Sequence, residues 1–159
     1  AANLNDLNRG MRVSQPLRQE FEAIQERWRA RCRDGRLPAR ADFPPESLTE
    51  WMGHIQIVEL VRGTETMRYR VRLVGTRIVY YEGRDNTGRF LDDVIPSEQR
   101  DEILEPYRRA ADAREPVRSE FYGCSDTAIS SKLERLILPL AGNGTTVDQF
   151  LVAIYRVGT

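Results

Sequence analysis

The segment MRYRVRLVGTRIVYYEGRDNTGRFLD, which spans residues 67–92, decides the fold. In its first eight residues apolar and arginine side chains alternate, as expected for a β-strand with two different faces. One face carries Met67, Tyr69, Val71 and Leu73, and the other carries Arg68, Arg70 and Arg72. Glycine then follows at Gly75, Gly83 and Gly88, and this residue permits the backbone conformations of helix ends and tight turns. We therefore expect short helical turns that cross one face of a sheet before the next strand begins.

The rest of the chain predicts, in order, a helix, two strands, helices and three strands. Apolar residues recur at helical spacing in residues 16–33 and 97–113, and residues 46–52 allow about two further helical turns. Strands are predicted at residues 54–61, 67–74, 117–122, 133–140 and 147–156, with AGNGT as a hairpin turn between the last two. Ser97 is expected to cap the helix 97–113, and Pro106 is expected to kink or divide it. Its buried side is predicted to carry Ile103, Leu104, Tyr107 and Ala111.

The N-terminal helix has a narrow apolar stripe. Its members are four, three and four residues apart and so line one side of a helix: Leu17, Phe21, Ile24 and Trp28. Such a stripe can face the protein's own sheet or a second copy of the chain. We expect these four residues to form a homodimer interface. Residues 1–35 are accordingly predicted to be a tail and an amphipathic dimerisation helix, and residues 36–159 to be the domain proper.

The arginine face of the strand at residues 67–74 leaves two interpretations open. Most faces of this kind are simply solvated. Alternatively, the arginines pair with Glu20, Glu22 or Glu26 of the N-terminal helix, in the same chain or across a dimer, where exposed pairs would set register more than stability.

Five sequence blocks resemble a known family. The blocks GRLPARADFPP, HIQIVELV, YRVRLVGTRIV, GRDNTGRFLDD and LERLILPL occur in this order and cover about residues 28–155. Together they resemble the bacterial PAS-like proteins. The resemblance implies an α+β domain with a PAS-like five-stranded antiparallel sheet, short helices on one face and an N-terminal amphipathic helix. It also implies a sensory or interaction module in signal transduction, without an established ligand or cofactor.

A small pocket is expected between the sheet and residues 75–93, because glycine-broken turns cannot pack as tightly as one continuous helix. The candidate lining is Tyr69, Val71, Leu73, Ile78, Phe90, Ile137 and Phe150. In the light-sensing flavin branch of the PAS group, a cysteine in an Asn-Cys-Arg-Phe-Leu sequence forms the photo-adduct. The corresponding stretch at residues 86–91 reads NTGRFL and contains no cysteine, which argues against adduct photochemistry. The cofactor is therefore left open.

Neither catalytic nor metal-binding residues are predicted. His54 is the only histidine, and we expect it to be hydrogen-bonded or exposed at the start of a strand, because no partner group is spaced to work with it. Cys32 and Cys124 lie far apart without a CxxC partner, so neither a disulfide framework nor a zinc site is expected. Two alternatives to a sensor are a small α+β cone enzyme of the cyclase or isomerase type and a structural adaptor with a filled core.

Composition argues against several kinds of partner. The 24 basic residues balance 24 acidic ones, so no long-range field attracts the chain to nucleic acid. No apolar run approaches the about 18 residues that cross a bilayer, and the N-terminus lacks the order of a secretory signal, so we expect a cytoplasmic protein. The expected partners are a second copy of the chain, a small-molecule ligand and an unidentified signalling protein. Output through a separate protein is expected because no output segment follows Thr159.

Overall fold

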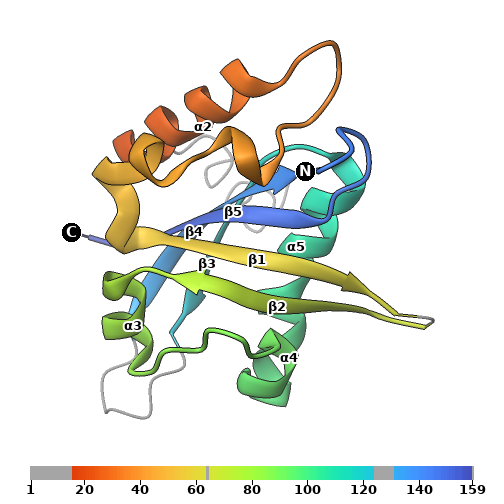
Figure 1. Cartoon of the computed structure of the whole chain (residues 1–159). Helices are drawn as coiled ribbons and strands as arrows, with labels where there is room; N and C mark the ends of the chain where they lie inside the picture. The colour runs from red at the N-terminus through yellow and green to blue at the C-terminus, as the bar shows by residue number, and fades with distance from the viewer. Residues whose placement is uncertain (1–15, 64, 124–130, 159) are drawn as a thin grey trace, which may run out of the picture.

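The computed structural model describes residues 16–63, 65–123 and 131–158. At its centre lies a five-stranded antiparallel sheet with the strand order β2-β1-β5-β4-β3 (Figure 1). The strands are β1 (Ile55–Arg62), β2 (Met67–Val74), β3 (Val117–Tyr122), β4 (Lys132–Leu140) and β5 (Gln149–Arg156). The α+β architecture predicted from the sequence is confirmed, and each strand begins and ends within two residues of its predicted bounds.

The two strands at the middle of the sheet are buried on both faces. In β5 the six residues from Phe150 to Tyr155 are all buried, and in β4 the same is true from Arg135 to Leu140. Successive side chains of a strand point to opposite faces, so an unbroken buried run requires a cover on each side. Helices from both halves of the chain provide these two covers.

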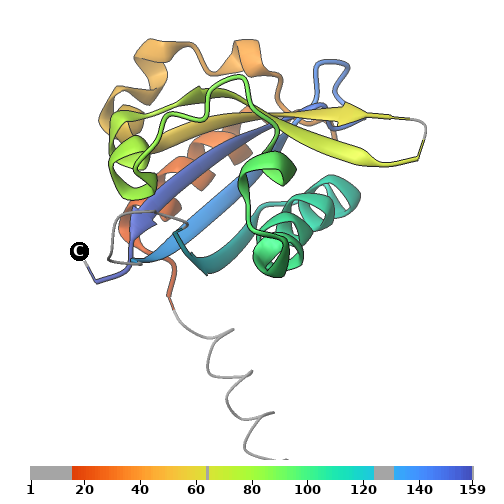
Figure 2. The same ribbon diagram turned by 90° about the horizontal axis from the view of Figure 1, so that it is seen from below.

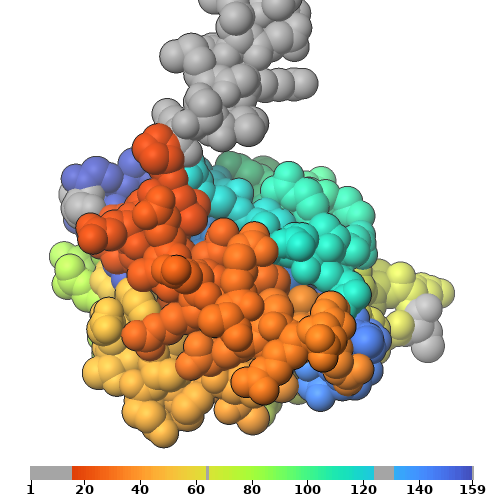
Figure 3. Space-filling model, turned by 90° about the horizontal axis from the view of Figure 1, so that it is seen from above, coloured from red at the N-terminus to blue at the C-terminus, as the bar shows by residue number. Residues whose placement is uncertain are grey.

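One face is covered by the helices that precede the sheet. They are α2 (Gln19–Arg31) and two 3₁₀ helices, η1 (Arg40–Asp42) and η2 (Pro45–His54). Seen from this side, α2 and residues 36–54 hide most of the sheet (Figure 3). The indole nitrogen of Trp28 donates a hydrogen bond to the carbonyl oxygen of Pro139 in β4 at 2.8 Å, and the ring of Phe21 packs edge-on against Tyr155 in β5.

This packing corrects the expected dimer interface. Phe21, Ile24 and Trp28 are 0 %, 1 % and 2 % exposed within a single chain, and Leu17 packs partly buried against the same core. Their stripe therefore faces the protein's own sheet, which was the other interpretation of the pattern. The three buried side chains are not free to contact a second copy.

The opposite face is covered by the segment between β2 and β3. It contains α3 (Thr76–Glu82), α4 (Leu91–Val94), a 3₁₀ turn η3 (Ser97–Gln99) and α5 (Arg100–Ala113), and Figure 2 shows α4 and α5 together on this side. The predicted burial of Ile103 and Tyr107 is confirmed, whereas Leu104 and Ala111 are only partly buried. Pro106 neither ends nor divides α5, which continues through it as one helix.

A β-bulge in β2 changes the face to which part of this strand belongs. Val71 pairs with Val58, but Leu73 pairs with Ile57, so the register shifts by one residue between them. Leu73 therefore shares a face with Ile57 and not with Val71. The sequence alternation predicts one common face because it cannot show where an extra residue enters the strand.

The arginines of β2 are neither simply solvated nor paired with α2. Arg68 forms ion pairs with Asp92 and Asp93, and its guanidinium lies 3.8 Å from the centre of the Phe90 ring. Arg70 and Arg72 both reach Glu59 on the neighbouring strand β1. The two interpretations given for this face are thus replaced by pairs within the sheet and with α4.

No helix in the described ranges has the length and apolar character to cross a membrane.

Candidate functional site

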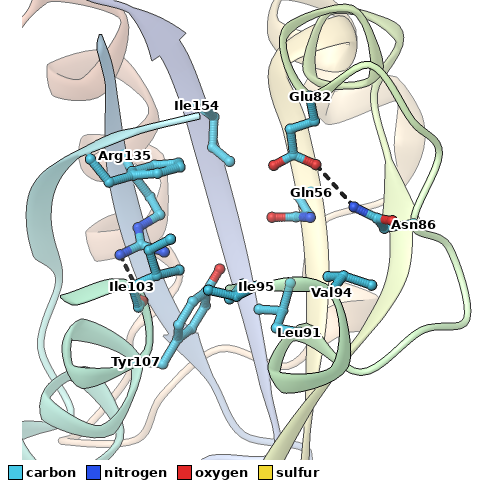
Figure 4. Close-up of a pocket in the computed structure, with 11 residues that line it drawn as sticks. Gln56, Glu82, Asn86, Leu91, Val94, Ile95, Ile103, Tyr107, Arg135 and Ile154 are labelled. Carbon is cyan, nitrogen blue, oxygen red and sulfur yellow. Dashed lines mark hydrogen bonds between the residues drawn. The ribbon is translucent and has the colours of Figure 1, made fainter. Parts of the chain in front are cut away.

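A small cavity lies between the sheet and the helices α3, α4 and α5 (Figure 4). Its volume is about 50 Å³. It is lined by Gln56, Glu82, Asn86, Leu91, Val94, Ile95, Ile103, Tyr107, Phe121, Arg135 and Ile154. Apolar side chains supply most of the wall, whereas Gln56, Glu82, Asn86 and Arg135 bring polar groups into it. A few polar groups that converge in an apolar enclosure are typical of a small-molecule site.

Arg135 is the most unusual member of this cavity. It lies on β4, is only 2 % exposed, and is held between the rings of Tyr107 and Phe121 at 4.9 and 4.8 Å. Its Nε donates to Ser119 Oγ at 3.1 Å, and one terminal nitrogen donates to the carbonyl oxygen of Ile103 at 2.9 Å. Burial lowers the pKa of this guanidinium, but arginine remains charged throughout the physiological range. The cavity therefore contains a permanent positive charge.

Glu82 brings an acidic group to another part of the wall. It is the last residue of α3, where Gly83 ends the helix in a left-handed conformation with φ of 73°. Burial raises the pKa of the Glu82 carboxyl to about 7, although Asn86 and Arg135 act in the opposite direction. Asn86 donates a weak hydrogen bond to this carboxyl at 3.4 Å. Near neutral pH the carboxyl is consequently shared between its protonated and ionised forms.

Two amide side chains complete the polar lining. Gln56 lies on β1 opposite Val152 of β5 and is only 2 % exposed. Asn86 follows α3 in the turn that leads to α4 and is 8 % exposed. Figure 4 shows Gln56, Glu82 and Asn86 on one side of the cavity and Arg135 on the other, with the hydroxyl of Tyr107 directed between them. The cavity therefore presents separate cationic and amide-acid sides to a bound molecule.

None of the seven residues predicted to line a pocket lines this cavity. Tyr69 and Phe150 belong instead to a cluster of rings with Tyr107, at centroid distances of 5.2 Å each. Leu73 is turned to the other face by the bulge, and Phe90 lies under Arg68. The remaining members, Val71, Ile78 and Ile137, are fully buried core residues. The segment 75–93 nevertheless contributes Glu82, Asn86 and Leu91 to the lining.

The polar residues that line the cavity were not among the predicted pocket residues. For two of them the sequence contains a signal, a polar residue within an apolar run. Gln56 and Arg135 interrupt the apolar runs HIQIVELV and LERLILPL. A polar residue within a strand that is buried on both faces has no route to solvent and must find a partner inside. Neither residue was recognised, because burial on both faces depends on helices from distant parts of the chain.

His54 lies outside this cavity. Its Nδ1 donates to the carbonyl oxygen of Ile154 at 3.0 Å, and its ring stacks on Tyr155 with 3.9 Å between ring centres. The predicted hydrogen bond of His54 is confirmed, but the residue is the last of η2 and immediately precedes β1 instead of starting the strand. Burial lowers the pKa of His54. Within the part of the chain that the structure describes, no three histidine, cysteine, aspartate or glutamate side chains converge on a point that could hold a metal ion.

Solved structures of light-oxygen-voltage proteins have the same fold. A light-oxygen-voltage domain studied with a flavin analogue superimposes with a TM-score of 0.54 at 14% identity, over 71% of this chain and 83% of that chain. The light-oxygen-voltage protein of Rhodobacter sphaeroides gives 0.53 at 13% identity, over 89% and 69%. The light-state domain of the blue-light photoreceptor Aureochrome1 gives 0.52 at 9% identity, over 71% and 88%. At such low identities the likeness concerns the fold alone.

Sequence comparison gives the family. No curated protein sequence matches the chain significantly. The PAS domain family, in contrast, matches residues 17–155, a range that includes α2, every residue of the cavity lining and all five strands except the last residue of β5. The match agrees with the resemblance noted in the five sequence blocks and with the topology of the solved light-oxygen-voltage structures. The chain belongs to the PAS domain family.

Proposed function

We propose that this PAS domain is a sensory module that binds a small molecule in the cavity and passes the signal to a separate protein. The observation that carries the proposal is the convergence of Arg135, Glu82, Gln56 and Asn86 on one small enclosure. Buried polar groups cost free energy unless they are paired, so a core without a ligand role would rarely retain four of them together. A molecule that enters the cavity would supply the missing partners.

The ligand that we propose for this module is smaller than a flavin. Pockets that enclose drug-sized ligands have volumes of about 300–1,000 Å³. The cavity of this chain is about 50 Å³, and the side chains of Arg135 and Tyr107 project into the enclosure between the sheet and the helices. The stretch at residues 86–91 also lacks the cysteine that adduct photochemistry requires. A molecule of a few atoms fits this site, whereas a three-ring cofactor does not.

Binding, and not catalysis, is the activity that we propose. The cone-enzyme alternative relied on a histidine and carboxylates inside one cavity, but His54 is occupied by Ile154 and Tyr155 outside it. The adaptor alternative requires a filled core, which is at odds with an enclosure lined by polar groups. Association with a second copy of the chain remains part of the proposal, through a surface other than the buried stripe of α2.

A ligand titration followed by NMR tests this function. The labelled protein would be titrated with a panel of neutral and charged polar compounds of about three to six non-hydrogen atoms, a size set by the cavity. We expect at least one compound to shift the backbone amide signals of Gln56, Leu91 and Arg135 in a saturable manner. Val94→Phe fills the cavity and should abolish these shifts.

Val157→Phe is the matched control, because Val157 is exposed and does not line the cavity. This variant should bind as the wild type does. The sensor proposal is wrong if no compound of the panel affects the cavity amides, or if Val94→Phe binds every active compound with unchanged affinity.

A further inference from the structure

One buried polar atom of the cavity lining has no hydrogen-bond partner among the described residues. Gln56 is almost completely buried, and its side-chain amide borders the cavity. The Oδ1 atom of Asn86 is buried without a hydrogen-bond partner, although the amide nitrogen of the same side chain donates to Glu82. An unpaired buried acceptor requires a donor, and an amide that borders the cavity offers both a donor and an acceptor. A polar molecule in the cavity could donate to Asn86 Oδ1 and bond to the amide of Gln56.

The charge within the cavity is unbalanced as well. The hydrogen bonds of Arg135 go to neutral oxygens of Ser119, Ile103 and Tyr107, and its guanidinium lies near two aromatic rings. Across the described ranges, no carboxylate forms an ion pair with this guanidinium. A buried charge is costly to maintain without a counterion. A bound anion would supply one.

Glu82 does not fill this role. Its carboxyl lies on the same cavity and forms no ion pair with Arg135 among the described residues, and desolvation raises its pKa to about 7, which favours the protonated form below that pH. A protonated Glu82 leaves Arg135 without a counterion and adds one more hydrogen-bond donor to the wall. The electrostatics of the enclosure thus favour a guest with a single negative charge.

Size limits the guest to a few atoms. A cavity needs about 10–15 Å³ of space for a water-sized sphere to hold one water molecule, so a cavity of about 50 Å³ accommodates about three to five waters or a ligand with a similar number of non-hydrogen atoms. Planar carboxylates match the fork of an arginine guanidinium and are a good geometric fit to its donors.

We propose that the cavity binds a small carboxylate anion that also carries a hydrogen-bond donor, an inference that rests on the sensor function proposed above. The carboxylate lies against the guanidinium of Arg135 and accepts from the amide nitrogen of Gln56. The donor of the ligand, such as a hydroxyl group, satisfies Asn86 Oδ1. Glycolate is a small probe that combines both features, and acetate carries the carboxylate alone.

Binding of the anion is linked to the proton on Glu82. The groups that face this carboxyl are Asn86 from the following turn, Arg135 from β4 and Tyr107 from α5. Of these, only Arg135 is charged at neutral pH, and it attracts the ligand at every pH. Ionisation of Glu82 adds a negative charge beside the ligand, so affinity should fall by up to about tenfold per pH unit above pH 7. In Glu82→Gln this dependence should disappear.

Calorimetric titrations with four probes test the ligand class. Sodium glycolate, sodium acetate, acetamide and sodium chloride would be titrated into the wild-type protein at pH 6.5 and constant ionic strength. We expect glycolate to bind severalfold tighter than acetate, and acetate at least tenfold tighter than its neutral isostere acetamide. Chloride should give no saturable heat. Equal affinity for acetate and acetamide would overturn the inference without any variant being needed.

Single substitutions test whether acetate binds in the cavity. Arg135→Met should weaken acetate at least tenfold, and Gln56→Met, which leaves the guanidinium in place, should weaken it severalfold. Arg72→Met is the matched control, because Arg72 is exposed on β2 and pairs with Glu59 away from the cavity. It should bind acetate as the wild type does. Unchanged acetate affinity in both cavity variants would refute the site.

The titrations also separate this inference from the broader function. If a neutral compound of the NMR panel enters the cavity while acetate and glycolate do not, the carboxylate inference is wrong and the sensor function stands. If no neutral or charged compound enters, both are wrong.

Discussion

Glu134 and Arg135 are consecutive residues of β4 that serve opposite faces of the sheet. The carboxylate of Glu134 accepts a hydrogen bond from Arg18, which immediately precedes α2, and both side chains of this ion pair are largely buried. Arg135 points the other way, into the cavity. Neighbouring side chains of a strand share one backbone, so we expect a displacement of Arg135 by a ligand to reach the anchor of α2. β4 thus provides a short structural connection between the cavity and the helix on the far face.

This connection predicts a response at Trp28. The indole N–H of Trp28 donates to Pro139, four residues along β4 from Arg135, so its NMR signal should shift when acetate or glycolate binds. Trp51 supplies an internal control, because its ring packs against Arg27 on the outer helices and has no bond to β4. The indole signal of Trp51 should move much less. Equal shifts of both indoles, or none at Trp28 when the cavity is saturated, would contradict transmission through β4.

Glu82 predicts an unusual pH dependence of stability. The pKa of its carboxyl is about 7 in the folded chain against an ordinary value of 4.5, so the folded state binds this proton more tightly than the unfolded state does. The contribution of Glu82 to the free energy of unfolding should therefore be constant below pH 4.5, fall between pH 4.5 and 7, and level off above. The rise in the pKa of Glu82 from 4.5 to about 7 corresponds to a contribution of about 3 kcal/mol to the free energy of unfolding.

Denaturant unfolding of wild type and Glu82→Gln, in buffers without carboxylates, measures this contribution. Gln mimics the protonated carboxyl and cannot ionise, so the variant should match the wild type near pH 5 and be more stable at pH 8. The difference between the two proteins removes the effects of all other titrating groups. A difference that does not change with pH would show that Glu82 titrates normally.

The apolar stripe of α2 predicts a loss of stability and not a change of oligomeric state. Phe21 is fully buried against the ring of Tyr155, so Phe21→Ala should cost about 3–5 kcal/mol of unfolding free energy. Light scattering of the folded variant should give the same mass as the wild type. A shift from dimer to monomer at unchanged stability would restore the dimer interface that the pattern first indicated.

The sequence predicts the sheet well because alternation and turn residues are local signals. The bounds of β2 and β3 are predicted without error, and α5 differs mainly in its start, where the turn η3 precedes it. The face of the sheet on which a side chain lies is harder to predict from neighbouring residues alone. Leu73 was assigned to the wrong face because a single bulge reverses every side chain beyond it.

The cavity itself depends on still longer-range information. Gln56, Glu82 and Arg135 come from β1, α3 and β4, and only the folded chain brings them together. Their enclosure requires that α4 and α5, which lie later in the chain than β1 and α3, cover this face of the sheet. An arginine inside LERLILPL could have been flagged as a buried polar residue, but its neighbours could not have been named from spacing.

Substitution of His54 should lower the stability of the protein without changing its affinity for acetate. Replacement by Ala removes the hydrogen bond to Ile154 and the stack on Tyr155, which should cost about 1–2 kcal/mol of unfolding free energy. Acetate affinity should be unchanged, because the ring does not line the cavity. His54→Asn, which keeps a donor near the same carbonyl, should recover part of the stability. A large loss of ligand affinity in the folded Ala variant would place His54 in the binding machinery after all.

A crystal structure determined with saturating sodium glycolate, compared with one determined without it, shows directly whether the cavity binds a small carboxylate. We expect density for glycolate inside the cavity. Its carboxylate oxygens should lie at hydrogen-bond distance, about 2.7–3.2 Å, from the guanidinium of Arg135 and the amide nitrogen of Gln56. The glycolate hydroxyl should lie within the same distance of Asn86 Oδ1. Density for water alone in the cavity, or glycolate bound only at another place on the protein, would contradict the proposed site.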